Sequence, residues 1–592
     1  IAWVKDASAI YTDNCYLLSV SGRVVTDANN DCLVDSTELG LANQIVRFEK
    51  GGVASYFTTY NSNGDYQAFL DTGTYTVTVI PTNSYWQACP VSQQVQITSS
   101  YNLQILDWAL QPVVFCSQLR VDLSVPILRP AIPSFYNVNY CNEGTIPANN
   151  AYVEVLLDSD LNIQSSSVPI TSQVGNLYTF NIGNVGVGAC GNFNIEVIVD
   201  PSAQLGQTHC SQAHIYPDTI CTPNIWVNSR LAVDAQCQND TVIFTINNYG
   251  AAMAQPTTYY VFEDNIMMRQ SNFQIGIGGA QQVIQPADTG KTYRIIAKQE
   301  SGYPSMLGDS VITAAVEGCV PYPNGSFNTG FITQFSNGNS APFIAIDCQQ
   351  NVASYDPNDK KAQPAGYDMT NHYIYDYTAL DYKIRFQNTG TDTAFNITIL
   401  DTISPYLDLA TLEMGASSHN YTWSIQNGNV LTMKFANIML PDSNVNEPLS
   451  NGFFRYRIEQ KANNPMGTII NNSAAIYFDF NPPIITNTTW HTIGEDFVNV
   501  ILLDQTTLLD EAIEVNVYPN PFKEMTTLEV KGKDYKQLEM SVLDATGRVV
   551  KTITSTEQNR IQLSRMGMIQ GVYFYQLKGD NQLINTGKVV VQ

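Results

Sequence analysis

One pattern recurs three times in this chain: a strand-like stretch of alternating apolar residues that ends in Asn-x-Gly. The copies lie at residues 136–144, 241–250 and 382–390. Alternating apolar side chains place one face of a strand against a core, and Gly after Asn permits the turn into the next strand. Because the copies recur at domain-scale spacing, the repeat predicts an all-β fold class of tandem Ig-like β-sandwich domains in an elongated array.

The composition agrees with sandwiches. Only 14% of the 592 residues are charged, and 33 Tyr outnumber 29 Lys and Arg. Tyr packs its ring in a half-buried sheet and keeps its hydroxyl solvated. The net charge of -24 disfavours nucleic acid and anionic lipid as partners and suits cation binding. No apolar run approaches the roughly 20 residues that a membrane span needs, so no membrane span is expected.

The cysteines indicate an oxidising compartment. None lies after Cys348 and none forms a Cys-x-x-Cys pair, so disulfides are favoured over metal sites. Their number is odd, so one thiol is either free or paired between chains. The cysteines are Cys15, Cys32, Cys89, Cys116, Cys141, Cys190, Cys210, Cys221, Cys237, Cys319 and Cys348.

Four ordered motifs mark the last part of the chain, residues 515–592. These are YPNPF at 518–522, L-D-x-x-G-R at 543–548, G-x-Y at 571–573 and T-G-K-x-V-V at 586–591. Their order resembles the type A sorting domain of type IX secretion, which exports proteins across the outer membrane of Bacteroidota. The resemblance implies a cell-surface or extracellular protein, outer-membrane attached or released, with the type IX secretion machinery as a partner.

An acidic loop follows the strand at 19–25. Its spacing matches the calcium loop D-x-[DN]-x-[DN]-G-x5-E, with hard oxygens that would wrap one ion. Cys32 stands where Gly is usual and resists a positive φ, so either the loop differs from an EF-hand or a disulfide holds it. The alternative is a solvated acidic turn. The expected Ca²⁺ ligands are Asp27, Asn29, Asp31, the Leu33 carbonyl, Asp35 and Glu38.

Together with N-G-x-Y at 63–66 and G-x-Y-x-V at 73–77, this loop resembles the SdrD B-like (B-type) repeats of Gram-positive adhesins. Those repeats are calcium-bearing sandwiches that act as stiff stalks. Cys32 and Cys89, near the two ends of this module, are the expected disulfide pair. Farther on, the Asn-x-Gly strand at 382–390 and the stretch 472–484 resemble the DUF11-like repeat domain, which often precedes a type IX sorting domain.

These features give a domain plan. Residues 1–16 are an N-terminal segment, either a first edge strand or remnant of an upstream domain, or a strand donated to a neighbouring molecule. The others are a SdrD B-like calcium-bearing sandwich at 17–113, Ig-like sandwiches at 114–222 and 223–320, a linker at 321–355, a DUF11-like sandwich at 356–494, a connector at 495–514 that is too apolar to be free, and the sorting domain at 515–592.

Catalytic patterns are lacking. The sequence contains five His, no G-x-S-x-G elbow and no Cys beside a plausible base. His209 and His214 flank Cys210 at a spacing that fits no common zinc site, and Cys210 is expected in a disulfide. The predicted function is a non-enzymatic cell-surface structural or adhesion rod that self-associates into a fibre or binds a surface glycan or protein. The alternative is the non-catalytic carbohydrate-binding region of a secreted polysaccharide-degrading enzyme.

Overall fold

The computed structural model describes residues 18–98, 104–218, 226–304, 308–338, 341–353, 356–426, 428–495, 514–544, 548–557, 559–580 and 582–592. These residues form β-strands, apart from loops and the 3-10 turns η2 (Ile332–Gln334) and η3 (Pro448–Ser450), so the predicted all-β fold is confirmed. No helix in this described part is long and apolar enough to cross a membrane. The N-terminal segment 1–16 and nearly all of the connector 495–514 lie outside the described residues.

Two compact units divide the chain. The first comprises Ile1–Asn228, Ser301–Ile312 and Pro323–Glu495, and the second Ser229–Glu300, Thr313–Tyr322 and Asp496–Gln592.

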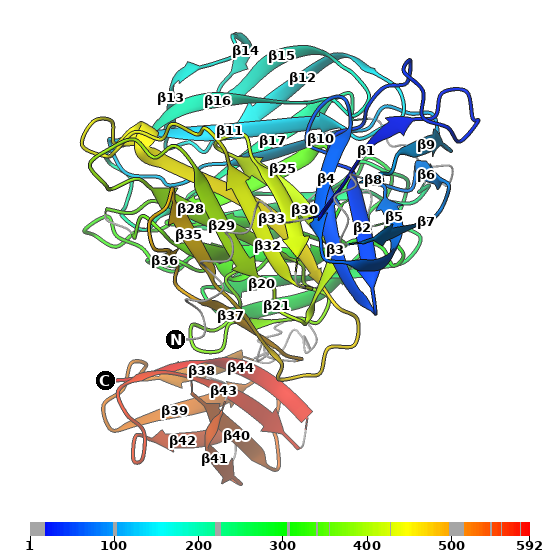
Figure 1. Ribbon diagram of the computed structural model, residues 1–592. Coiled ribbons are helices and arrows are strands. Elements are labelled where there is room, and N and C mark those ends of the chain that lie inside the picture. Colours follow the sequence, from blue (N-terminus) through cyan, green and yellow to red (C-terminus); the bar gives the residue numbers. More distant parts are fainter. Residues whose placement is uncertain are drawn as a thin grey trace. The chain divides into compact units, whose positions relative to one another are not determined.

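In the first unit, the N-terminal sandwich follows from alternation: β5 buries Tyr75, Val77 and Val79 and leaves Thr74 and Thr76 exposed. One of its sheets has the order β4-β1-β9-β6, with β8 beside β1, and faces β3-β2-β5-β7 across a shared core (Figure 1). Its strands are β1 (Leu18–Thr26), β2 (Ile45–Lys50), β3 (Val53–Thr58), β4 (Asp65–Leu70), β5 (Gly73–Ile80), β6 (Trp86–Cys89), β7 (Gln93–Ile97), β8 (Gln104–Ile105) and β9 (Trp108–Pro112).

The second sandwich packs the sheet β10-β11-β16-β13 on β14-β15-β12-β17-β25. Its last strand comes from the segment that the sequence suggested to be a linker: β25 pairs with β17, and Phe343 and Ala345 belong to this core. Part of 321–355 is therefore structural. The strands are β10 (Leu119–Ser124), β11 (Pro133–Asn142), β12 (Ala148–Leu156), β13 (Leu161–Ser166), β14 (Ile170–Val174), β15 (Leu177–Val185), β16 (Cys190–Val199), β17 (Thr208–Tyr216) and β25 (Ile344–Gln350).

Residues 360–493 form another sandwich of the first unit, whose core residues lie on β26-β28-β33-β30, on β35-β29-β32-β31 and on the small sheet β27-β37-β34. β31 also pairs with β3 of the N-terminal sandwich, so both share one nine-stranded sheet. The strands are β26 (Lys360–Gln363), β27 (Tyr373–Ile374), β28 (Leu380–Gln387), β29 (Ile397–Thr402), β30 (Leu407–Ser417), β31 (Thr422–Gln426), β32 (Val430–Phe435), β33 (Asn451–Gln460), β34 (Ile469–Asn472), β35 (Ala474–Phe478), β36 (Ile484–Ile485) and β37 (Thr489–Ile493).

The second unit contains two sheet pairs. Its N-terminal part has β18-β19-β22 and β21-β20-β23-β24, and its C-terminal part, the predicted sorting domain, has β38-β39-β42 and β41-β40-β43-β44 around one core. The strands are β18 (Leu231–Cys237), β19 (Thr241–Asn248), β20 (Thr257–Glu263), β21 (Ile266–Phe273), β22 (Ala280–Pro286), β23 (Tyr293–Lys298), β24 (Val311–Val316), β38 (Glu514–Tyr518), β39 (Met525–Lys531), β40 (Leu538–Leu543), β41 (Val549–Ser555), β42 (Arg560–Ser564), β43 (Gly571–Gly579) and β44 (Gln582–Val591).

The repeated Asn-x-Gly motif has one physical role in all three copies. Asn142, Asn248 and Asn388 are buried, and the side-chain oxygen of each accepts the N–H of the Gly two residues later, at 3.0, 2.9 and 3.1 Å. Each side-chain amide donates to carbonyls of the following loop. The Asn therefore replaces the backbone partners that the strand loses where the sheet ends.

Three of the sandwiches contain disulfides. Cys141 lies directly opposite Cys190 on β11 and β16, and Cys210 opposite Cys348 on β17 and β25. Cys237 pairs with Cys319, Cys32 with Cys89 as predicted, and Cys116 is also disulfide-bonded. Cys15 and Cys221 lie outside the described residues, so the expectation of an odd thiol is not tested.

Candidate metal centre

The acidic loop begins where β1 ends, and its first and last carboxylates form its base. Asp27 is 0% and Glu38 6% exposed. The Asp27 carboxylate accepts the N–H groups of Asp31 and Cys32 and the Gln111 side-chain amide at 2.8–3.1 Å. Glu38 accepts the N–H groups of residues 28 and 35 at 3.0 and 3.1 Å. These bonds tie the two ends of the loop together.

The other predicted ligands line the outer part of the loop. Asn29, Asp31, Leu33 and Asp35 are exposed. The Asp31 carboxylate accepts the Leu33 N–H at 2.8 Å and the Asn29 side-chain amide at 3.0 Å. Hydrogen bonds from the Thr37 hydroxyl and N–H lower the pKa of Asp35. The outer carboxylates thus remain open to solvent and to a cation.

Cys32 adopts a positive φ, the backbone conformation that a Cys at this position was expected to resist. Its φ is +62°, and Asn30, two residues earlier, has φ +59°. The disulfide to Cys89 ties this residue to the end of β6, and the Cys32 N–H donates to Asp27. The loop therefore turns without Gly, and the disulfide and the hydrogen bond to Asp27 both constrain the turn.

The chemistry of this donor set fits a hard cation. Asp27, Asp31, Asp35 and Glu38 lie within twelve residues, and no Lys, Arg or His of the described chain forms an ion pair with them. Their oxygens accept N–H groups and do not converge as a compact ligand cluster; the one such cluster of His, Cys, Asp or Glu in the described residues lies elsewhere. Ca²⁺ would be held by Asp27 and Glu38 at the base and by the exposed oxygens above.

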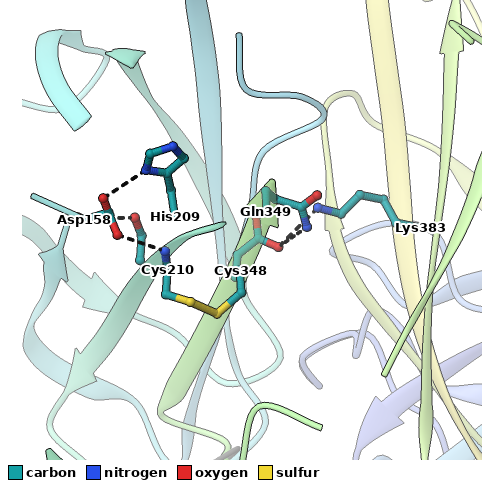
Figure 2. The surroundings of a disulfide bond; sticks show 8 residues. Asp158, His209, Cys210, Cys348, Gln349 and Lys383 are labelled. Carbon is teal, nitrogen blue, oxygen red and sulfur yellow. Dashed lines mark hydrogen bonds and ion pairs between the residues drawn. A yellow bond between two sulfur atoms is a disulfide. The ribbon is translucent and has the colours of Figure 1, made fainter. Parts of the chain in front are cut away.

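The compact cluster consists of Asp158, Asp160 and His209. His209 is buried, and its Nδ1 lies 3.0 Å from the Asp158 carboxylate, which also accepts the Cys210 N–H beside the disulfide (Figure 2). Asn351 accepts the Gly206 N–H and donates to His209 Nε2 at 2.8 Å, which fixes the amide orientation. Both ring nitrogens of His209 are therefore used in hydrogen bonds, as expected of a structural histidine.

The first unit also contains a cavity of about 300 Å³. Asp347 pairs with Lys383, and Asp381 with Arg455, along its wall. His491 Nε2 donates to a backbone carbonyl, and burial lowers the pKa of His491 to about 4. Apart from His372, which precedes β27, the ionisable wall groups come from β25, β26, β28, β33 and β37, so no local motif in the sequence could have revealed them.

The Trp side chains of the described residues do not form an exposed row. Trp86 and Trp108 are buried, Trp226 and Trp423 are half-buried, and Trp490 is 41% exposed. Trp490 packs edge-on against His372, 4.6 Å between ring centroids, at the cavity. One exposed indole beside a cavity is the feature that the glycan-binding alternative could use.

Two family models match parts of the chain. Residues 516–592 match the secretion system C-terminal sorting domain, which confirms the type IX sorting domain and identifies the chain as a secreted, cell-surface or extracellular protein. Residues 356–492 match a domain of unknown function, DUF7619, over almost the range expected for the DUF11-like sandwich. The resemblances to DUF11 and to SdrD B-like repeats stay predictions. No curated protein matches the chain.

The chain is similar to solved structures of two pilus proteins and an adhesin domain. The major pilin subunit BcpA of Bacillus cereus is 12% identical, with 52% of this chain and 97% of that chain covered and a TM-score of 0.15. The pilus protein RrgB of Streptococcus pneumoniae is 8% identical, covering 81% and 93%, with a TM-score of 0.23. A collagen-binding domain of a Staphylococcus aureus adhesin is 13% identical, covering 24% and 100%, with a TM-score of 0.16.

Proposed function

We propose that the chain is a non-enzymatic structural or adhesion protein of the cell surface, exported by type IX secretion. The observation that carries this proposal is covalent: each of the cysteine-bearing sandwiches contains at least one disulfide, and a sorting domain follows them. Such bonds raise the resistance of small β-domains to unfolding outside the cell. End-to-end assembly of these sandwiches into a fibre is the finer form of the proposal.

Surface display in a bacterium with type IX secretion tests the export step. The full chain should be labelled by antibody on intact cells, whereas a chain lacking residues 516–592 should stay inside the outer membrane. Equal labelling of both chains would contradict the assignment.

Negative-stain images of the purified protein then test assembly: fibres support polymerisation, and monomers at all concentrations contradict it.

We further propose that Ca²⁺ binds the loop from Asp27 to Glu38. Four carboxylates without a cationic partner among the described residues support this site, since a divalent ion would relieve their mutual repulsion. EDTA should lower the thermal midpoint of the protein, and Asp31→Ala should remove that effect. Asp71→Ala is the control, because Asp71 is exposed in the same sandwich outside the loop. An EDTA effect unchanged by Asp31→Ala would exclude the loop.

The cavity beside Trp490 supports glycan binding as a second candidate function. An exposed indole and polar groups such as Gln363 and Asn487 line it together, which is the combination that stacks on and hydrogen-bonds a sugar. Retention on glycan beads that Trp490→Ala abolishes would favour this function. Trp423→Ala is the control, because Trp423 lies away from the cavity lining. Without retention by any glycan, the structural role stands alone.

A further inference from the structure

The sandwich at 360–493 contains an ammonium and a carboxylate at its centre. Lys360 on β26 and Asp401 on β29 are both 0% exposed, and the Lys360 Nζ contacts the Asp401 carboxylate. The rings of Tyr382 and Tyr456 lie 4.6 and 5.3 Å from Nζ. A single ion pair enclosed by aromatic rings is costly, because the desolvation of both charges opposes their attraction.

An amide completes this group. The hydroxyl of Tyr456 donates to Asp401 at 2.6 Å and accepts from both Lys360 Nζ and Asn472 Nδ2 at 3.0 Å. Asn472 is 2% exposed, and its side-chain oxygen has no hydrogen-bond partner in the described chain. The Tyr456 hydroxyl thus hydrogen-bonds to an amine, a carboxyl group and a carboxamide within the same apolar core.

Burial makes the amine a nucleophile. Desolvation lowers the pKa of Lys360 to about 8, since the core disfavours the charged form. Transfer of a proton from Lys360 to Asp401 converts the buried ion pair into a neutral amine and a carboxylic acid. Both neutral groups are cheaper to bury than the ions, and a neutral amine can attack a carbonyl carbon.

This sandwich also differs from its cysteine-bearing neighbours. No cysteine follows Cys348, so no disulfide can form within residues 356–494. Lys360 lies on its first strand, whereas Asn472 ends β34, far along the chain. A bond between these two side chains would close a long loop, as the Cys210–Cys348 disulfide does in the second sandwich.

We propose that Lys360 and Asn472 form an intramolecular amide crosslink, with Asp401 as the proton carrier. Nζ attacks Cγ of Asn472, and the carboxylic acid of Asp401 protonates the side-chain oxygen. Asp401 then takes the extra proton from Nζ and passes it to Nδ2. The Cγ–Nδ2 bond breaks and ammonia leaves while the proton on the side-chain oxygen returns to Asp401, so the amine and the carboxamide give one secondary amide and one ammonia. The reaction needs no oxidant, reductant or further reactant.

The mass of the purified full chain tests the proposal after reduction and denaturation, which remove any contribution from disulfides. The expected mass is lower than the sequence mass by one ammonia molecule, and a protease digest should contain one branched peptide that joins Lys360 to Asn472. A deficit of one water molecule with a Lys360–Asp401 branch would overturn the assignment to Asn472. An unmodified mass would overturn the crosslink itself.

Two variants identify the roles of the residues. Asn472→Asp should change the lost molecule from ammonia to water, because a carboxyl then supplies the acyl group. Asp401→Asn should give the full sequence mass, because no group remains to carry the proton. Asn471→Asp is the matched control. Residue 471 is exposed, so the same substitution next to Asn472 should leave the loss of ammonia unchanged. Loss of ammonia in Asp401→Asn would contradict the role of Asp401.

Discussion

The Lys383 ammonium lies 3.2 Å from the Asp347 carboxylate, and both side chains are buried where two sandwiches of the first unit meet. Lys383 belongs to β28 and Asp347 to β25 of the second sandwich. Asp347 also accepts the Val125 N–H, and Lys383 donates to the Val125 carbonyl at 2.9 Å. The pair therefore lies in a closed hydrogen-bond network rather than in solvent.

Lys383→Met should destabilise the first unit by about 3–5 kcal/mol, because the substitution leaves the Asp347 charge buried without its cation. Urea unfolding followed by circular dichroism measures the change. Lys434→Met is the control, since Lys434 is exposed on β32 of the same sandwich. Adding Asp347→Asn to Lys383→Met should restore part of the loss; a double variant as unstable as the single one would contradict the charge argument.

Removal of the Cys32–Cys89 disulfide should affect both stability and calcium. The double variant Cys32→Ala, Cys89→Ala should lose about 2–4 kcal/mol, the usual effect of a disulfide. The turn at Cys32 should also relax from its φ of +62°, so the calcium-dependent rise in thermal midpoint should shrink. Differential scanning calorimetry with and without Ca²⁺ measures both effects.

The Cys237–Cys319 disulfide provides the matched control for that variant, because it lies in the second unit. Its removal should lower stability and leave the calcium-dependent shift unchanged. If the calcium-dependent rise in thermal midpoint were the same in the two double variants, the Cys32–Cys89 disulfide would not contribute to calcium binding.

His491 predicts a loss of stability in mild acid. It is 1% exposed, and burial lowers its pKa from 6.5 to about 4, with a smaller contribution from His372. Between these values the unfolded chain binds a proton that the folded chain does not, so stability falls as the pH falls from 6.5 to 4. The total is about 3 kcal/mol from a shift of this size.

His491→Gln should flatten this pH dependence, because Gln carries no titrating group and can still donate to the Pro364 carbonyl. His419→Gln is the comparison: burial lowers the pKa of His419 too, and its ring nitrogen pairs with the Ser418 hydroxyl instead. Urea midpoints at several pH values measure both. An unchanged slope for His491→Gln would assign the acid sensitivity to other groups.

Local chemistry made much of the fold predictable. Alternation and the Asn-x-Gly turn depend on neighbours in sequence, and the buried Asn142, Asn248 and Asn388 show why that motif recurs. The sorting domain was predictable for the same reason, since its motifs lie within a single sandwich.

Pairings between distant strands were not predictable. β25 pairs with β17 although 127 residues, 217–343, lie between the two strands in the sequence. Nothing in the run 344–350 distinguishes a strand added to an earlier sandwich from the first strand of a new one. The Lys360–Asp401 pair was not predictable either. In the sequence each residue is typical of an exposed charge, and only the packing of the sheets buries both. For the acidic loop, the ligand set read from the spacing stays a prediction, and the spacing could not show that backbone N–H groups occupy the Asp27 oxygens.

The edge shared by β3 and β31 leads to the last prediction. Tyr56 pairs in register with Ile425 and packs in the core of the sandwich at 360–493, although it belongs to the N-terminal sandwich. Phe57 on the same strand faces the core of its own sandwich. Tyr56→Ala should therefore cost about 3–5 kcal/mol, the usual effect of truncating a buried aromatic residue, and should release β31. Hydrogen exchange should then speed up in 422–426, whereas Phe57→Ala should speed up exchange in β2 and β5 and leave 422–426 protected. The same exchange pattern in both variants would mean that the shared sheet does not couple the two cores.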